Sequence, residues 1–197
     1  MAKNLEQRVT ELEKMVMELQ GKAVTKIRKK LGIGDTFKIA GLEWTILDIT
    51  DKGYVCLADK YGKDVKFDSA CNNWSASDLR NYLNKEFFKT LANVVGEDNI
   101  IPFERDLLSL DGQTEYGTCE DKVSLLSVDG YRKYRKLIPN TVYYWWLLTP
   151  WSTPCNGYEK SVTVVCPSGF IIYYDCYYDY GVRPLCIFSS AIFESEE

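Results

Sequence analysis

A change of hydrophobic period near residue 34 is the feature that most constrains this chain. Before it, apolar residues recur at alternating steps of four and three, the spacing of a coiled-coil seam. They are Leu5, Val9, Leu12, Val16, Leu19 and Ala23. From residue 36, apolar and polar residues alternate as in strands, over 36–49 and 54–59. We therefore expect a coiled-coil helix within residues 1–31 and a separate domain over residues 34–193.

The seam over residues 5–23 predicts a homo-oligomer, either a dimer or a trimer. Valine at a and leucine at d favours two strands, and charged residues flank the seam. The alternative is a single amphipathic helix packed on its own domain. Residues 1–31 carry eight bases and four acids. No aromatic residues interleave that basic segment and the remaining chain is acidic, so we expect no nucleic-acid partner.

Several function classes are excluded by what the sequence lacks. The chain has no histidine, which removes catalysis and metal binding through imidazole. Its seven cysteines are scattered and none forms CxxC, which predicts free, mostly buried thiols and no zinc site. No apolar run is long enough for a membrane span, and the charged N-terminal segment does not resemble a signal peptide. We expect a cytoplasmic or virion-associated protein without a cofactor.

The pattern after residue 59 predicts a mixture of helices and short strands. Leu79, Leu83, Phe87 and Leu91 share one face of a helix expected over residues 76–92. A short helix or turn is expected over 129–136. Short strands are expected at 123–128, 142–149, 161–166, 169–174 and 182–188. This order predicts an α+β fold.

Tyrosine is concentrated near the C-terminus. Residues 142–193 hold eight of the 14 tyrosines but only five charged residues. Residues 172–180 read IYYDCYYDY, and neighbours in an extended chain point to opposite faces. Some of these rings must therefore be exposed, as in a binding surface, because tyrosine supplies contact area with few rotatable bonds. The alternative is an aromatic-rich core with a few incidental exposures.

Six short motifs occur in a distinctive order. They are Asn73-Trp74, SDLRNYLN (77–84), VSLLSVDGY (123–131), WWLLTP (145–150), PSGF (167–170) and GVRPLCI (181–187). In this order they resemble a family of C-type-lectin-fold domains common in gut bacteria and their phages. The same fold is used by formylglycine-generating enzymes and by the variable proteins of diversity-generating retroelements. In those variable proteins, adenine mutagenesis rewrites the residues between the WW strand and the terminal GVRP.

The resemblance implies a C-type-lectin-like ligand-binding domain whose variable region spans about residues 145–184. Trp145, Trp146, Pro150 and residues 181–184 match scaffold positions, and Arg183 is expected to cap backbone carbonyls or pair with a buried acid. Most of the expected contact residues are types reached from an asparagine codon by changing adenines. The expected ligand contacts are Leu148, Trp151, Ser152, Thr153, Cys155, Asn156, Tyr158, Ser168, Phe170, Ile172, Tyr174, Asp175, Tyr177, Tyr178 and Tyr180.

The resemblance favours a binding protein for an unknown protein or glycan ligand over an enzyme. An enzyme of the formylglycine-generating type needs a reactive cysteine pair that holds copper. Cys166, Cys176 and Cys186 are available, but tyrosines rather than cations surround Cys176, so its thiol pKa should not be lowered. No E-P-N or W-N-D stretch suggests a calcium site. A structural virion or scaffold protein, with the aromatic segment in a subunit interface, is the other alternative.

Overall fold

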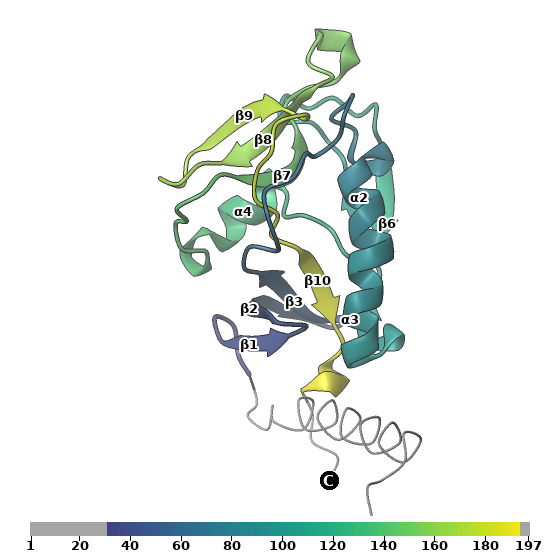
Figure 1. Ribbon diagram of the computed structural model, residues 1–197, viewed down its shortest axis with the longest axis vertical. Coiled ribbons are helices and arrows are strands. Elements are labelled where there is room, and N and C mark those ends of the chain that lie inside the picture. Colours follow the sequence, from purple (N-terminus) through teal and green to yellow (C-terminus); the bar gives the residue numbers. More distant parts are fainter. Residues whose placement is uncertain (1–30, 194–197) are drawn as a thin grey trace, which may run out of the picture.

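The computed structural model describes residues 31–193, which begin with a three-strand meander (Figure 1). Its strands belong to a five-stranded sheet of order β1-β2-β3-β10-β4, in which every pair is antiparallel. These strands are β1 (Thr36–Ile39), β2 (Leu42–Thr50), β3 (Gly53–Ala58), β4 (Ile100–Ile101) and β10 (Leu185–Phe188). The meander expected from period-two alternation is confirmed. Because β10 pairs with β3, the last strand returns to the first part of the domain.

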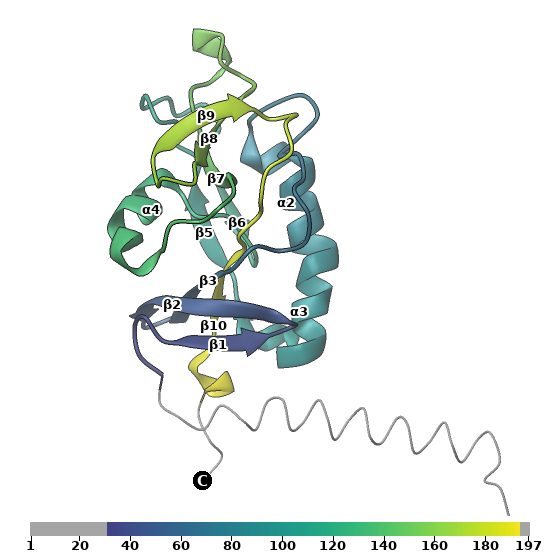
Figure 2. The same ribbon diagram turned by 60° about the vertical axis from the view of Figure 1, so that its left-hand side comes forward.

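Two smaller antiparallel sheets complete the strand content. The first is β5 (Phe103–Asp106) paired with β6 (Thr118–Asp121), which the sequence analysis did not predict. The second is β7-β8-β9, made of β7 (Trp145–Pro150), β8 (Ser161–Val165) and β9 (Ile171–Asp175). Figure 2 shows this three-stranded sheet at the opposite end of the domain from β1 and β2. Strand β9 is at the edge of its sheet.

One long helical segment runs beside the sheets in both ribbon views. It comprises α2 (Asp78–Tyr82), the π-helical turn η2 (Leu83–Phe87) and α3 (Phe88–Val95). The side chain of Ser77 accepts a hydrogen bond from the Arg80 amide and caps the start. Gly96 ends it with a φ of 85°. The predicted helix is confirmed, with its bounds moved to 78–95, and its four predicted apolar residues are at most 4% exposed.

The expected strand at 123–128 is wrong. These side chains are largely buried, but only Ser124 forms a bridge, to Leu185. The segment cannot continue as a strand because Ser127 caps a helix, accepting a hydrogen bond from the Gly130 amide. That helix is α4 (Val128–Tyr134), which confirms the helix expected there. The remaining short helices are η1 (Trp74–Ala76), η3 (Glu97–Asn99), η4 (Arg135–Leu137), η5 (Pro154–Asn156) and η6 (Ser190–Ile192).

The core contains four fully buried tryptophans and three buried charged groups, Asp68, Asp121 and Arg183, of which the last two hold distant segments together. The tryptophans are Trp44, Trp74, Trp145 and Trp146. Asp121 is 2% exposed and accepts hydrogen bonds from Trp74 Nε1 and Arg80 Nε, both at 2.7 Å. Arg183 donates through Nε to the Ala58 carbonyl at 3.0 Å, which confirms its expected carbonyl-capping role.

The domain is therefore a mixed α+β fold built from antiparallel sheets and helices, as the sequence predicts at the level of fold class. The predicted coiled-coil helix and its seam over residues 5–23 lie outside the described residues. All seven cysteines are free and four are buried, which confirms the prediction for the thiols. Within residues 31–193, no helix has both the length and the apolar character needed to cross a membrane.

Candidate ligand-binding site

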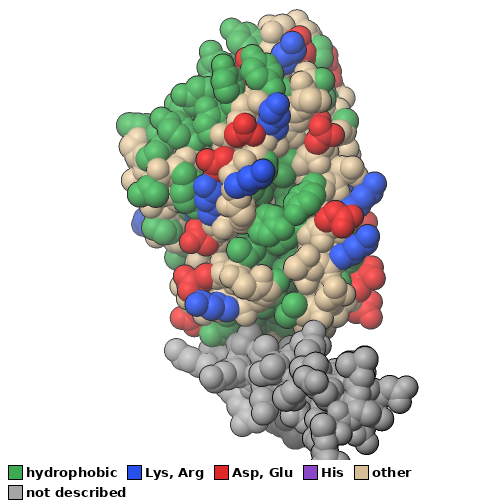
Figure 3. Space-filling view, viewed as in Figure 1, with side chains coloured by type: hydrophobic (Ala, Val, Ile, Leu, Met, Phe, Trp, Pro, Cys, Tyr) green, Lys and Arg blue, Asp and Glu red, His purple; other side chains and the backbone are tan. Residues whose placement is uncertain are grey.

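The edge strand β9 sends successive tyrosines to opposite faces of its sheet. Tyr173 lies opposite Thr163 in the register, and Tyr174 lies opposite Val162. Tyr173 is 43% exposed, whereas Tyr174 is half-buried and packs against the main core. The prediction that neighbouring tyrosines cannot all be buried is confirmed. Figure 3 shows hydrophobic side chains, a class that includes tyrosine, gathered over the end of the molecule where β8 and β9 lie.

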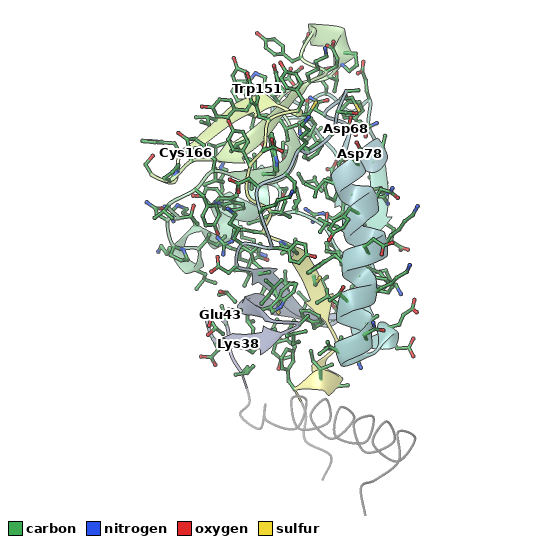
Figure 4. All side chains as sticks on the ribbon, viewed as in Figure 1. Lys38, Glu43, Asp68, Asp78, Trp151 and Cys166 are labelled. Carbon is green, nitrogen blue, oxygen red and sulfur yellow. The ribbon has the colours of Figure 1, made fainter. Side chains whose placement is uncertain are left out.

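On the outer face of β9, three aromatic side chains form a cluster. The ring of Trp151 lies over that of Tyr173, with centroids 4.3 Å apart and an interplanar angle of 34°. The Tyr158 ring meets Tyr173 edge-on at 6.3 Å. Tyr158 is 44% exposed and Trp151 is half-buried. Figure 4 labels Trp151 at the same end of the molecule. These contacts hold the rings in place without removing them from solvent.

A second group of tyrosines extends from the core to the surface. Tyr180 packs edge-on against the buried Trp146 at 5.0 Å and lies 5.0 Å from Tyr174. Tyr174 in turn contacts Tyr178, which is 49% exposed and lies 5.1 Å from Tyr177. The outermost rings therefore rest on a chain of rings anchored in the core.

Asp175 fixes the outer end of this group. The hydroxyl of Tyr177 donates to Asp175 Oδ2 at 2.5 Å, and this hydrogen bond raises the pKa of Tyr177 to about 12. Ser161 also donates to Asp175, across the β8–β9 pair. Tyr177 thus stays a neutral hydroxyl at physiological pH, and its exposed ring is oriented by a short hydrogen bond.

A cavity of about 550 Å³ opens beside the outer cluster. It is lined by Leu110, Asp111, Trp151, Ser152, Asn156 and Tyr158. Asp111 accepts hydrogen bonds from Ser109 Oγ at 2.5 Å, Ser152 Oγ at 2.6 Å and Asn156 Nδ2 at 2.8 Å. The bonds from Ser109 and Ser152 are the main reason why the pKa of Asp111 lies below its ordinary value. The carboxylate is therefore ionised at neutral pH.

The loop that carries Trp151 and Tyr158 is anchored by Asn72, which is fully buried. Asn72 Nδ2 lies 2.8 Å from the Ser152 carbonyl, 2.9 Å from that of Tyr158 and 2.7 Å from that of Ser161. Its Oδ1 accepts a hydrogen bond from the Tyr116 hydroxyl at 2.7 Å. A single amide therefore fixes both ends of the loop that forms the cavity wall.

Two of the expected contact residues, Leu148 and Thr153, are fully buried, so their side chains cannot meet a ligand directly. Leu148 is fully buried because β7 lies inside the domain, with the Leu148 amide bonded to the Leu126 carbonyl. Thr153 is fully buried and its hydroxyl contacts Cys155 Sγ. Ser152 is 2% exposed because it turns inward to Asp111. Placing Leu148 and Thr153 on the ligand face was wrong, whereas Ser152, although nearly buried, lines the cavity beside Asp111.

The other expected contacts are at least partly exposed, but they do not form a single patch. Cys155, Asn156, Tyr158, Ser168, Phe170, Tyr177 and Tyr178 are exposed, and Trp151, Ile172, Tyr174, Asp175 and Tyr180 are partly exposed. Ser168 and Phe170 lie at or beside the β8–β9 turn, at the other end of β9 from Asp175. Figure 4 shows the neighbouring Cys166 well apart from Trp151. The two turn residues are therefore separate from the cavity.

Comparison of the chain with protein-family models, with curated proteins and with solved structures gives no match. The chemistry of the site is therefore inferred from the positions and contacts of its residues. Sequence reasoning missed Asp111, Leu110 and Asn72. The first two precede Trp151 by about 40 residues and carry no pattern beyond an Asp-Gly turn, and Asn72 is a lone polar residue before the Asn-Trp motif.

The cysteine thiols near the site do not share a lowered pKa. Burial raises the pKa of Cys176 to about 11, which confirms that this pKa is not lowered. Burial also raises the pKa of Cys186 well above its ordinary value. At Cys166, burial acts in the same direction, but hydrogen bonds with Ser168 and nearby backbone amides outweigh it and lower the pKa. Among residues 31–193, no group of three His, Cys, Asp or Glu side chains is arranged to hold a metal.

Proposed function

We propose that this protein binds a macromolecular ligand through the rings on both faces of β9 and the turn that follows it. We call these rings the aromatic surface, defined as Trp151, Tyr158, Tyr173, Tyr174, Tyr177 and Tyr178. One observation carries the proposal. Exposed rings along β9 and the following turn pack against neighbouring rings and are held in place by buried core residues and hydrogen bonds. Such rings supply contact area and hydroxyl groups with little loss of conformational freedom on binding. The ligand is a protein or a glycan.

The proposal includes a C-type-lectin-like fold. Two observations support it: the antiparallel pairing of the late strand β10 with β3, and the burial of the motif residues that the resemblance assigns to the scaffold. Trp145, Trp146 and Arg183 are at most 4% exposed. The motif residues are thus buried, and many of the residues between them are exposed. This is the distribution expected of a protein whose core stays constant while its surface residues vary.

We further propose that the surface is diversified, as in the variable protein of a diversity-generating retroelement. The exposed residues between β7 and β10 are mostly tyrosine, serine, asparagine and aspartate, types that adenine changes in an asparagine codon produce. Genes of sibling strains should then differ mainly at adenines in codons 148 to 180. Sequencing those genes is the measurement, and differences spread evenly over the whole gene would contradict diversification.

Self-association through residues 5–23 is also part of the proposal. A coiled coil would join several copies of the binding site. It would raise the apparent affinity for a multivalent ligand by roughly a hundredfold or more where the geometry permits. Light scattering on the full chain should give two or three times the chain mass of 22.7 kDa. A chain that is monomeric at micromolar concentration would exclude this part of the proposal.

The main test replaces Tyr158, Tyr173 and Tyr178 with serine together. All three are 43–49% exposed, so the unfolding free energy should fall by no more than about 0.5 kcal/mol for each. Binding to ligands selected by the wild-type protein, from a displayed random-peptide library and from a glycan array, should be lost.

Tyr82→Ser is the matched control, because Tyr82 is equally exposed, at 43%, but lies on α2 away from the aromatic surface. It should retain binding to every selected ligand. If the triple variant binds as well as this control does, the aromatic surface is not the binding site. If the triple variant fails to fold, the rings belong to the core.

A further inference from the structure

The carboxylate of Asp111 has three hydrogen-bond donors but no charged partner within the described part of the chain. Its donors are two hydroxyls and one side-chain amide, all neutral. No lysine or arginine of residues 31–193 forms an ion pair with it. The residue is exposed and borders the cavity. A full negative charge is thus held in a fixed position at the edge of a hollow.

The walls of the same cavity are apolar and aromatic. Trp151 and Tyr158 line it together with Leu110, which is 41% exposed. The faces of tryptophan and tyrosine rings attract cations, and tryptophan does so most strongly. An aliphatic side chain such as that of Leu110 can pack against the methylene stem of a long cationic side chain. Rings, an aliphatic wall and an ionised carboxylate therefore surround one space.

We propose that this cavity receives a cationic side chain, a lysine or an arginine, of a protein ligand. The inference rests on the proposed function and narrows its ligand from any macromolecule to a protein with an exposed basic residue. The stem of that residue lies against Leu110 and the rings, and its head group donates hydrogen bonds to Asp111. Charge-assisted hydrogen bonds of this kind are shorter and stronger than neutral ones.

A neutral glycan fits the cavity less well. A sugar ring can stack on Trp151, and its hydroxyls can donate to Asp111, but three neutral donors already serve that carboxylate. A fourth neutral donor would leave the charge uncompensated while water is expelled from around it, which is costly. A cation offsets part of that cost because it brings the opposite charge into the site.

The experiment selects peptides from a random displayed library with the wild-type protein and measures their affinities for Asp111→Asn. The selected peptides should share a lysine or arginine. Their affinity for Asp111→Asn should fall by about tenfold or more, because hydrogen bonds to charged groups are the strong class. Asp98→Asn makes the same charge change at an exposed position before β4 and should leave affinity unchanged.

A second measurement does not depend on how well the variant folds. Replacing the shared basic residue of a selected peptide with methionine should weaken binding to the wild-type protein by the same factor and remove most of its sensitivity to added NaCl. Selected peptides that bind through the tyrosines but share no basic residue would overturn the cationic pocket and leave the proposed function standing. If neither a peptide nor an array glycan that depends on Tyr158, Tyr173 or Tyr178 is recovered, both proposals are overturned. If only glycans are recovered, the cationic pocket alone is overturned.

Discussion

Replacing Asn72 with aspartate should lower the free energy of unfolding by about 3–5 kcal/mol at pH 7 and disorganise the loop that carries Trp151 and Tyr158. The substitution keeps the shape of the side chain but turns its donor group into an acceptor that faces three carbonyl oxygens. The position is fully buried, so water cannot compensate for the lost hydrogen bonds. An uncompensated buried charge is among the most destabilising changes a core can receive.

The sign of the pH dependence follows from that charge. Burial beside carbonyl oxygens raises the pKa of the introduced carboxyl above its value in the unfolded chain. The native state of the variant then binds a proton more readily than the unfolded state, so acidification favours folding. The stability deficit relative to wild type should therefore shrink as pH falls from 7 toward 4.

Urea denaturation at both pH values, followed by tryptophan fluorescence, measures these differences. Tyr116→Phe is the control, because it removes only the hydrogen bond to Asn72 Oδ1 and should cost about 1 kcal/mol. An aspartate variant that is no less stable than this control would show that Asn72 does not anchor the loop.

The second large effect is expected at Asp121, where alanine should cost about 3–5 kcal/mol. Its carboxylate accepts from the fully buried Trp74 Nε1 and from Arg80 Nε, and the substitution leaves both donors without that acceptor. The half-buried Arg105 is affected as well. Burial lowers the pKa of Arg105, and the charge of Asp121 is the largest influence opposing that shift. The variant therefore removes the ion-pair partner of Arg80 and the negative charge that most favours the ionised form of Arg105.

Thermal and urea unfolding of the purified variant test this prediction. The matched control is Glu120→Ala at the adjacent, exposed position, whose expected change is within about 0.5 kcal/mol. Equal stability of the two variants would mean that the buried charge network contributes little. A fall in the near-ultraviolet tryptophan signal of the Asp121 variant would show that tryptophan packing is disturbed, as expected when Trp74 loses its hydrogen-bond acceptor.

Periodicity predicted the regular elements well, because the meander and the 78–95 helix each bury one face against the core. It failed at 123–128, where a run of buried apolar residues belongs to an irregular segment that ends in a helix cap. It also missed β5 and β6, which read FERD and TCED and have no alternating pattern. Burial alone does not distinguish a strand from a buried loop.

For the site, composition identified the aromatic residues but not their orientation. The alternation of side chains along a strand correctly predicted exposed tyrosines. It could not predict that Leu148 and Thr153 face inward, because their burial depends on segments distant in sequence. Asp111 and Asn72 were missed for the same reason. Each acts on residues 152–161 through contacts that span 41 to 89 positions, which no local pattern reveals.

The pairing of β10 with β3 also determines how the domain can be attached to other objects. Phe37 and Phe193, near the two ends of the described chain, pack edge-on with ring centroids 4.9 Å apart. Figures 1 and 2 place that sheet at the far end from β8 and β9. A bead, a fluorophore or a fused protein linked at either end of the described residues 31–193 is therefore attached beside the five-stranded sheet, at the opposite end of the domain from β8 and β9.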